Sequence, residues 1–368
     1  MKIVFDYEIF YQQKYGGISS YFTNLGLELL KKDIDINFIC PIHKNYNLKK
    51  LPKKIVLGKK FIYPSSFNYL VSKINSNLSN AYCNSLKPTI IHKTYFSDNK
   101  PNPKYKNIIT FYDITHELNN SKTQENEKIK SLKKNNIQAA DHIICPSNRV
   151  KDDLISYLNI NKNKISVTHF SSDYKKISTM ELSEKKKMQN YLLYVGNRSG
   201  YKNFENFVSV FANSKRLQKD FKILVFGGEK PSVCGVDLIL KKGLSVDSFK
   251  FVQGTNEDLE YLYRNVRALI YTSAYEGFGI PLIEAMRSGC PIVTSNGGAL
   301  KEVGGSELSY FDPSNIEEMQ QQIEDTVYSS DKLVKTSIYG LKRSDDFSWS
   351  SCAEKTLEIY KKLLWLIY

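Results

Sequence analysis

Short apolar runs recur along the chain, and segments long enough for a helix separate them. The first run, residues 2–6, is followed by a polar loop and then by a predicted helix at about residues 18–31. Residues 34–39 alternate between apolar and polar positions, as a strand does. Further runs occur at residues 89–92, 107–111 and 142–145. This rhythm indicates a parallel sheet covered by helices on both faces.

The same pattern begins again in the second half of the chain. Residues 171–190 are polar, rich in lysine and without a strand signal, and a strong strand is predicted at residues 191–196. Later runs lie at residues 221–227, 249–252, 268–271 and 291–294. We therefore expect an α/β protein with two doubly wound domains. Two such domains in tandem place a ligand cleft between the carboxyl ends of their sheets. The predicted divisions are an N-terminal domain (1–170), a linker (171–190), a C-terminal domain (191–346) and a C-terminal helix (347–368).

Composition narrows the class of protein. The 368 residues are 41% hydrophobic and 24% charged, which excludes an intrinsically disordered or collagen-like chain. Six cysteines are scattered without metal-binding spacing, which favours a reducing compartment. The first residues lack the pattern of a secretory signal, and no apolar run approaches the length of about 20 residues that spans a bilayer. A cytoplasmic protein is expected, with any membrane contact peripheral.

The positive charge is concentrated in one segment. The chain has 52 Lys and Arg against 38 Asp and Glu, and residues 44–60 contain seven lysines and no acid. Aromatic residues follow at positions 61, 63, 67 and 69. A basic strip beside exposed rings is typical of a surface that binds anionic lipid. The alternative is a solvated face followed by a segment of the core.

The most informative stretch runs from Glu276 to Glu284. A glycine-rich turn (Gly277, Phe278, Gly279, Ile280) follows a strand, and Pro281 is suited to the first turn of a helix. Such a helix start directs backbone N–H groups toward an anion such as a diphosphate. A carboxylate accepts hydrogen bonds from a vicinal diol, so Glu284, expected in the first helical turn, suits a ribose and Glu276 a sugar hydroxyl.

Two further sites follow predicted strands. Arg198 and Lys202 lie just after the strand at residues 191–196, where two cations would neutralise charge on a departing phosphate. Gly16 and Gly17 allow the backbone to approach a phosphate closely. The spacing is not that of a dinucleotide fingerprint, which argues against a nicotinamide or flavin enzyme.

Taken together, these residues resemble the GT-B retaining glycosyltransferases of family four, which build bacterial lipopolysaccharide, O-antigen and capsule sugars. The likeness extends over almost the whole chain, and the pair Glu276 and Glu284 is its most specific part. The resemblance implies two Rossmann-like domains facing each other across a cleft, no metal and no cofactor other than a nucleoside-diphosphate sugar as donor. It also implies a C-terminal helix that packs back toward the N-terminal domain, whereas Lys361 and Lys362 before apolar residues would also suit an amphipathic tail lying on a membrane.

The resemblance also implies roles for individual residues. Arg198 and Lys202 would bind the donor diphosphate with help from the Gly17 amide. Glu284 would hold the ribose and Glu276 the transferred sugar, while the loop around Val252 would contact the base. Retention of configuration would proceed on the front face of the sugar, with the leaving phosphate helping to deprotonate the acceptor.

The chain departs from the family at one position that bears on chemistry. Relatives often place His-Asp after the strand that corresponds to residues 108–111, whereas this chain has Tyr112 and Asp113, with His116 one helical turn later. Asp113 and His116 are the predicted acceptor-side residues, and Tyr112 is the alternative to His116.

The sequence therefore predicts a hexosyltransferase that uses a nucleotide sugar and a glycan or lipid-linked glycan acceptor. GDP-mannose is the first donor to consider, by analogy with mannosyltransferases of similar opening sequence. A sugar-nucleotide epimerase, a phosphorylase and a basic nucleic-acid-binding protein are the alternatives, although no nucleic acid is expected as a partner.

Overall fold

The computed structural model describes residues 1–99, 101–118, 123–182, 187–198, 200–228 and 233–365. The chain forms two compact units. Unit 1 comprises Met1–Ser171 and Ser348–Tyr368, and unit 2 comprises Ser172–Phe347. Unit 2 is thus inserted into the sequence of unit 1. Its first residues were assigned to a linker by the sequence pattern, but Tyr174 and Ile177 are buried there.

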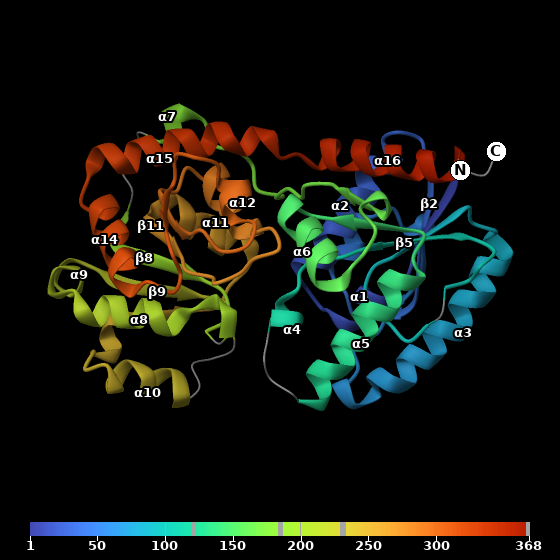
Figure 1. The fold of residues 1–368 in the computed structure, drawn as a ribbon, viewed down its shortest axis with the longest axis horizontal. Coiled ribbons are helices and arrows are strands. Elements are labelled where there is room, and N and C mark those ends of the chain that lie inside the picture. Colours follow the sequence, from blue (N-terminus) through green and yellow to red (C-terminus); the bar gives the residue numbers. More distant parts are fainter. Residues whose placement is uncertain (100, 119–122, 183–186, 199, 229–232, 366–368) are drawn as a thin grey trace. The chain divides into compact units, whose positions relative to one another are not determined.

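Unit 1 is built on a parallel sheet with the strand order β3-β2-β1-β4-β5-β6-β7. Its strands are β1 (Lys2–Phe5), β2 (Asp35–His43), β3 (Val56–Lys60), β4 (Ile90–Lys93), β5 (Lys106–Thr110), β6 (His142–Cys145) and β7 (Ile165–Val167). Its helices are α1 (Glu8–Gln12), α2 (Gly17–Leu30), α3 (Asn68–Leu86), α4 (Thr115–Leu118), α5 (Gln124–Ala139), α6 (Asn148–Leu158) and α16 (Trp349–Trp365). Figure 1 shows how these elements follow one another.

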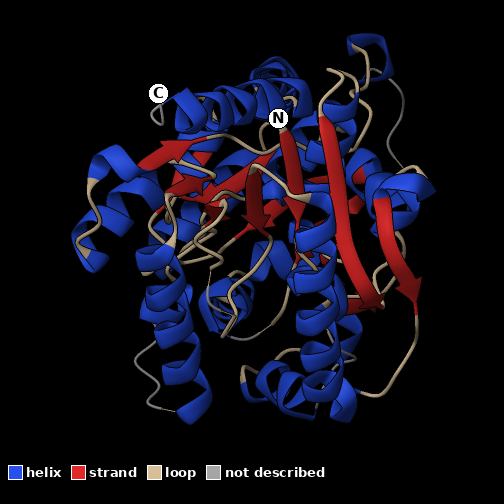
Figure 2. Cartoon of the chain, turned by 90° about the vertical axis from the view of Figure 1, so that its right-hand side faces the viewer, coloured by secondary structure: helices blue, strands red, loops and turns tan. Residues whose placement is uncertain are grey.

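Unit 2 repeats this plan with the strand order β10-β9-β8-β11-β12-β13. Its strands are β8 (Met188–Val195), β9 (Lys222–Phe226), β10 (Phe249–Val252), β11 (Val266–Tyr271), β12 (Ile292–Ser295) and β13 (Ser309–Phe311). Its helices are α7 (Thr179–Leu182), α8 (Phe204–Asn213), α9 (Lys215–Asp220), α10 (Val233–Lys241), α11 (Asn256–Asn265), α12 (Ile280–Arg287), α13 (Leu300–Gly304), α14 (Ile316–Val327) and α15 (Ser330–Arg343). Helices flank the strands, as Figure 2 shows. The predicted doubly wound α/β architecture is confirmed.

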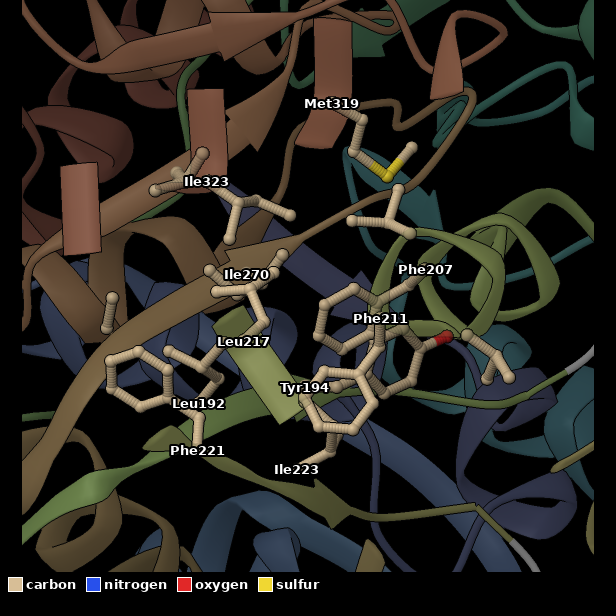
Figure 3. Packing of buried hydrophobic residues seen from close by; sticks show 14 of the residues in the cluster. Leu192, Tyr194, Phe207, Phe211, Leu217, Phe221, Ile223, Ile270, Met319 and Ile323 are labelled. Carbon is tan, nitrogen blue, oxygen red and sulfur yellow. The ribbon is translucent and has the colours of Figure 1, made fainter. Parts of the chain in front are cut away.

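The cores explain why apolar runs mark the strands. In unit 2 the inner strands and helices α8 and α14 contribute Leu192, Phe207, Ile270 and Ile323, each with no exposed surface (Figure 3). Strands buried on both faces read as nearly continuous apolar runs, which the sequence pattern detects. Burial of such side chains contributes about 1.5–3 kcal/mol each relative to exposure.

The strand order places a switch point in each unit. In unit 1, β1 lies between β2 and β4, and in unit 2, β8 lies between β9 and β11. Connections from the central strand leave toward opposite sides at this point, so a crevice opens at the carboxyl ends of the strands. Loops after β8, β9, β10 and β11 therefore meet at one edge of the unit 2 sheet. The same reasoning gathers the loops after β1, β2, β4 and β5 in unit 1.

Candidate active site

The loop after β8 is held in place by the loop after β11. Gly196 adopts φ 135°, and Asn203 adopts φ 59° just before α8. The Thr272 hydroxyl donates to the Lys202 carbonyl at 2.9 Å, and the Ala274 amide donates to the Tyr201 carbonyl at 2.6 Å. Lys202 is thus fixed at the carboxyl edge of the sheet, as the sequence predicted from its place after a strand.

Lys202, Glu276 and Tyr271 form a polar cluster at this edge. The Lys202 Nζ lies 2.5 Å from Glu276 Oε1, and the Tyr271 hydroxyl donates to the same oxygen at 2.9 Å. The two charged side chains keep only 16% and 12% of their surface exposed. Such limited exposure reduces screening by water, so this pair is stronger than one on an open surface. The structure thus brings together two of the predicted site residues.

Arg198, in the loop after β8, contacts the turn after β9 and the end of strand β10. Its Nη1 donates to the Gly227 carbonyl at 3.2 Å, and its guanidinium lies 5.4 Å from the centre of the Phe251 ring. The Gly227 amide in turn donates to the carbonyl of Val252 at 3.1 Å. Arg198, predicted for the diphosphate, lies in the loop after β8, and Val252, predicted for the base, is the last residue of β10; the turn after β9 contacts both at this sheet edge.

The glycine-rich turn packs tightly against the loop after β12. The Ala299 amide donates to the Glu276 carbonyl at 2.8 Å, and a Cβ on Gly298 would lie 2.2 Å from that same carbonyl oxygen. Gly277, Phe278 and Gly279 are buried. Gly279 precedes α12 with φ 96°, a conformation that favours glycine, and Ile280 is the first residue of the helix. The turn is therefore rigid and directs the amino end of α12 toward the site edge.

Glu284 lies just past the first turn of α12, in which the sequence pattern places it. The first turn of this helix contains no acid, because the helix begins at Ile280, so Glu284 falls in the second turn. The Tyr263 hydroxyl donates to Glu284 Oε2 at 3.4 Å. Burial raises the pKa of Glu284 to about 7, against the smaller lowering effect of the Tyr263 hydrogen bond. The carboxyl group is thus poised to change its charge near neutral pH.

In unit 1, Gly16 and Gly17 begin helix α2. Gly16 is the residue before the helix, and its carbonyl accepts hydrogen bonds from the Ser20 amide and the Ser19 hydroxyl at 3.0 Å each. A Cβ at Gly16 would lie 2.3 Å from Gln13 Oε1, so a side chain would require Gln13 to move. Gly17 is exposed, and its amide belongs to the unpaired first turn of the helix.

The predicted acceptor-side residues lie after β5. Asp113 Oδ1 accepts hydrogen bonds from the Thr115 amide and hydroxyl and lies 3.6 Å from Lys133 Nζ. Burial alone would raise the pKa of Asp113, but Lys133 and the Thr115 hydrogen bonds outweigh it and lower the pKa. Asp113 is therefore ionised and also orders its own loop.

Tyr112 and His116 differ in what their polar atoms contact. The Tyr112 hydroxyl is buried and donates to the Thr94 carbonyl at 2.8 Å. His116 lies in α4, and its Nδ1 has no hydrogen-bond partner among the residues that the structure describes. Burial, followed by the charge of Lys133, lowers the pKa of His116, so the imidazole is neutral at pH 7.

Several site residues carry no signal that the sequence reasoning used. Tyr271, the last residue of β11, donates a hydrogen bond to Glu276, and Tyr263 donates one to Glu284. Gly227 and Gly228 follow β9 and adopt φ 86° and 72°. All but Tyr263 lie at the carboxyl end of a strand. A glycine pair at that position could have been recognised by analogy with the other turns. The tyrosines are indistinguishable from core residues until the fold is known.

A cavity of about 1290 Å³ opens elsewhere in unit 1. It is lined by residues that begin strands, including Thr89, Lys106 and Asp141, together with Pro101 and Pro103. None of the predicted site residues lines it. Within the described ranges, no group of His, Cys, Asp and Glu residues could hold a metal ion.

Comparison with known proteins defines the class. A model of glycosyltransferase family 4 matches residues 15–170, and a model of group 1 glycosyl transferases matches residues 175–343. The sucrose-phosphate synthase of Thermosynechococcus elongatus superimposes with a TM-score of 0.74 at 16% identity, covering 99% of both chains. WaaG, a glycosyltransferase involved in lipopolysaccharide biosynthesis, has a TM-score of 0.73 at 15% identity, covering 97% of this chain and 99% of its own. The chain belongs to the glycosyltransferases of family 4 and group 1 with the GT-B fold.

Curated relatives narrow the comparison further. O-antigen chain mannosyltransferase B of Escherichia coli is 26% identical over 270 residues, which cover 70% of each chain. O-antigen chain mannosyltransferase RfbU of Salmonella typhimurium is 28% identical over 214 residues, covering 56% of this chain and 57% of its own. The match to the WbdA mannosyltransferases of Escherichia coli spans about a third of their length. The chain is thus similar, at moderate identity, to O-antigen mannosyltransferases.

Proposed function

We propose that this glycosyltransferase moves mannose from GDP-mannose onto a growing, lipid-linked surface glycan, with retention of configuration and without a metal ion. The observation that carries the proposal is the cluster of Lys202, Glu276 and Tyr271 at the switch point of unit 2, with Arg198 on the same sheet edge. The names of the curated relatives support mannose as the sugar.

Two cations at the sheet edge suit the leaving group of this reaction. The bond between the sugar C1 and the diphosphate oxygen breaks, and a bond from the acceptor oxygen to C1 forms on the same face. Negative charge then develops on the diphosphate, where Lys202 and Arg198 stabilise it. The acceptor proton passes to the departing phosphate oxygen, so no separate base is required. Gly16 and Gly17 are the proposed contacts of unit 1 with the donor.

The carboxylates would orient the donor. Glu276 already holds Lys202 through one oxygen, and a hydroxyl of the transferred sugar would donate to it when the donor is bound. Glu284 would accept hydrogen bonds from the ribose. Backbone N–H groups at the start of α12, from Ile280 onward, would face the diphosphate.

On the acceptor side, His116 fits the role better than Tyr112. The Tyr112 hydroxyl is occupied by the Thr94 carbonyl, whereas His116 Nδ1 is buried without a partner among the described residues, and the imidazole is neutral at pH 7. We propose that His116 contacts the acceptor hydroxyl. Asp113 would order the loop that carries His116 through its hydrogen bonds with Thr115.

A cytoplasmic enzyme with a lipid-linked acceptor would work at a membrane surface. Large apolar side chains in one segment of unit 1 are exposed: Phe61, Ile62, Phe67, Tyr69, Leu70, Ile74, Leu78 and Tyr82. Four of them, Leu70, Ile74, Leu78 and Tyr82, follow helical spacing along α3. Exposed lysines at positions 49, 50, 53, 54 and 59 lie in the same segment. This combination supports peripheral binding to anionic lipid. In the residues described, no helix is long and apolar enough to cross a bilayer.

Thermal-shift measurements with GDP, UDP, dTDP, ADP and CMP test the donor. A ligand that binds only the native state raises the melting temperature by an amount that grows with the logarithm of the ratio of its concentration to Kd. A shift with GDP and not with the other nucleotides supports the proposal. A shift with UDP alone would mean that the donor is a UDP-sugar and not GDP-mannose. The absence of any shift would contradict the proposal that the protein uses a nucleotide sugar. Nucleic acid is not expected to bind.

A further inference from the structure

Four lysines gather in unit 1 near the carboxyl end of β2, and one of them, Lys14, lies two residues before Gly16. We define the lysine cluster as Lys14, Lys44, Lys49 and Lys60. The Lys60 Nζ lies 3.0 Å from the centre of the Tyr46 ring, and the Lys49 Nζ lies 5.4 Å from the same centre. The Lys44 Nζ lies 5.4 Å from the centre of the Tyr63 ring, and Lys14 is close enough to lower the pKa of Lys44, after burial.

No acid compensates these charges. Residues 36–97 contain no Asp or Glu. Among the residues described, none of the four ammonium groups has a carboxylate within ion-pair distance. Lys44 is only 8% exposed, and the neighbouring His43 is 6% exposed with an Nδ1 that has no partner in the described chain. A buried lysine is normally paired, so Lys44 lacks the anion that its burial calls for, while Lys14 and Lys49 are exposed and accessible to one.

The cluster is held rigidly beside the start of α2. Tyr15 stacks on Tyr46 with the ring centres 4.6 Å apart and an angle of 8° between the planes. The Tyr46 amide donates to the Lys14 carbonyl at 2.9 Å, and Asn47 Nδ2 donates to Ser19 Oγ at 2.9 Å. Preorganised charges of this kind bind an anion without a large ordering cost.

We propose that the lysine cluster binds the phosphate or diphosphate of the acceptor, at the point where the acceptor glycan joins its apolar carrier. The inference rests on the proposed lipid-linked acceptor. Several neighbouring lysines match a multivalent anion, for which lysine acts as a point charge. Phe61 and Ile62 directly follow Lys60 and are 63% and 66% exposed. The surface therefore offers an apolar contact beside the cationic one, as an isoprenoid diphosphate requires.

The donor also carries a diphosphate, but the cations that suit it lie in unit 2. Arg198 and Lys202 are fixed at the switch point of that unit, next to the predicted ribose and sugar ligands. The lysine cluster belongs to unit 1, together with the predicted acceptor-side residues Asp113 and His116. We therefore assign the cluster to the acceptor.

Binding of farnesyl diphosphate to the full chain tests this assignment, with farnesol as the probe that lacks the anion. The variant Lys44→Met/Lys60→Met removes two charges and keeps the length of each side chain. The variant Lys128→Met/Lys134→Met removes two exposed charges from helix α5 of the same unit and is the matched control. We expect the first variant to bind farnesyl diphosphate at least about tenfold more weakly, which is the scale of one charge-assisted contact. The control variant should bind as the wild type does.

Binding of GDP, measured by calorimetry on the same proteins, separates the two possible sources of diphosphate. Unchanged GDP affinity in Lys44→Met/Lys60→Met supports an acceptor site, whereas a loss for GDP with farnesyl diphosphate unaffected would overturn it. An equal loss in both double variants would also overturn it, because charge alone would then explain binding. Binding of the wild type to phosphatidylglycerol vesicles but not to farnesyl diphosphate would also overturn it.

If GDP does not bind the wild type, the proposed donor fails independently of the lysine cluster. Thermal melting of each variant, with Lys44→Arg as the charge-retaining form, establishes that the fold is intact.

Discussion

At the scale of single residues, the contact between Lys202 and Glu276 bears most directly on chemistry. The lysine that we propose as a donor phosphate contact already has a carboxylate at 2.5 Å, and Tyr271 donates to the same carboxylate oxygen. The pair keeps both charges oriented before the donor arrives, which lowers the cost of arranging them later. The donor phosphate and Glu276 would then share the ammonium group, which has three N–H donors.

Replacing Lys202 by Met should therefore lower transfer by at least about 100-fold, the loss that follows removal of one preorganised transition-state contact. The melting temperature should fall as well, because the largely buried Glu276 carboxylate loses its cation, so rates are compared well below the melting transition of the variant. Steady-state rates with the donor found by thermal shift provide the measurement. Lys219→Met, an exposed lysine of the same unit, is the control and should keep full activity. Activity of Lys202→Met close to that of the wild type would exclude Lys202 from catalysis.

Glu284 should make donor binding depend on pH. Its pKa is raised to about 7, so the carboxyl group ionises between about pH 6 and pH 8, and only the ionised form accepts hydrogen bonds fully from a ribose. GDP affinity should rise over this range in the wild type. The Glu284→Gln variant should bind GDP more weakly than the wild type, and its GDP affinity should not show this rise with pH. The nucleotide phosphate itself titrates near pH 6, so calorimetry must compare the two proteins at each pH.

The same group also links stability to pH. Because the native carboxyl keeps its proton up to about pH 7 while the unfolded one loses it near the ordinary value of 4.5, its contribution to stability falls as the pH rises through that window. Glu284→Gln should remove this decline, whereas Glu317→Gln, at an exposed position, should not. Identical pH profiles for the wild type and Glu284→Gln would show that the raised pKa is incorrect.

At the scale of elements, helix α16 completes unit 1. It lies beside α2, as Figure 1 shows, and buries Cys352, Thr356 and Tyr360. The Tyr360 hydroxyl is 2.6 Å from His92 Nδ1, and His92 Nε2 is 2.8 Å from the Thr110 hydroxyl. His92 has no exposed surface, and burial lowers its pKa to about 3, so it is neutral and needs both partners.

Tyr360→Phe should lower the free energy of unfolding by about 1–3 kcal/mol, because it leaves a buried ring nitrogen of His92 without a partner. Urea denaturation followed by circular dichroism measures this change. Tyr157→Phe alters an exposed tyrosine of α6 and is the matched control. An unchanged midpoint for Tyr360→Phe would mean that the hydrogen bond contributes nothing to the stability of unit 1.

The elements also show how far the sequence could predict the structure. Strands such as β1 and β11 are apolar runs buried on both faces, and their pattern identified them directly. Strands β3, β7 and β13 were not predicted, because they are short and only partly buried. The site residues that follow strands were predicted from the rule that ligands bind at carboxyl ends. Glu284 was placed in the first turn of α12 rather than just past it because the start of this helix depends on Gly279, whose positive φ the sequence does not reveal.

At the scale of the whole molecule, unit 2 is an insertion whose two ends are joined by one side chain. Arg287 Nη1 donates to the Tyr174 carbonyl at 3.0 Å, and Arg287 Nη2 donates to the Phe347 carbonyl at 2.7 Å. Lys176 and Asp345 form an ion pair at 2.6 Å nearby. The segments by which the chain reaches and leaves unit 2 are therefore held close together. A compact unit with adjoining ends is the arrangement in which an inserted domain folds by itself.

We expect the fragment 172–347 to fold alone, with a cooperative thermal transition, and to bind the same nucleoside diphosphate as the full chain. The fragment 1–171 should lack such a transition, because without α16 the Tyr360 partner of His92 is missing and apolar surface is exposed. Fusing residues 348–368 to it through a short linker should restore cooperative melting. Scanning calorimetry of the three proteins measures these transitions. A cooperative transition in the fragment 1–171 would show that unit 1 does not need α16 to fold.

The return of α16 to unit 1 has a consequence for the order of events during translation. Domains generally fold as the chain emerges, beginning with the N-terminal one. Here the ribosome has made the first sheet long before it makes the helix that covers it, and all of unit 2 is synthesised in between. Unit 2 can therefore reach its native state while unit 1 still waits for α16. A nascent chain of this enzyme would bind nucleotide before its first half is finished.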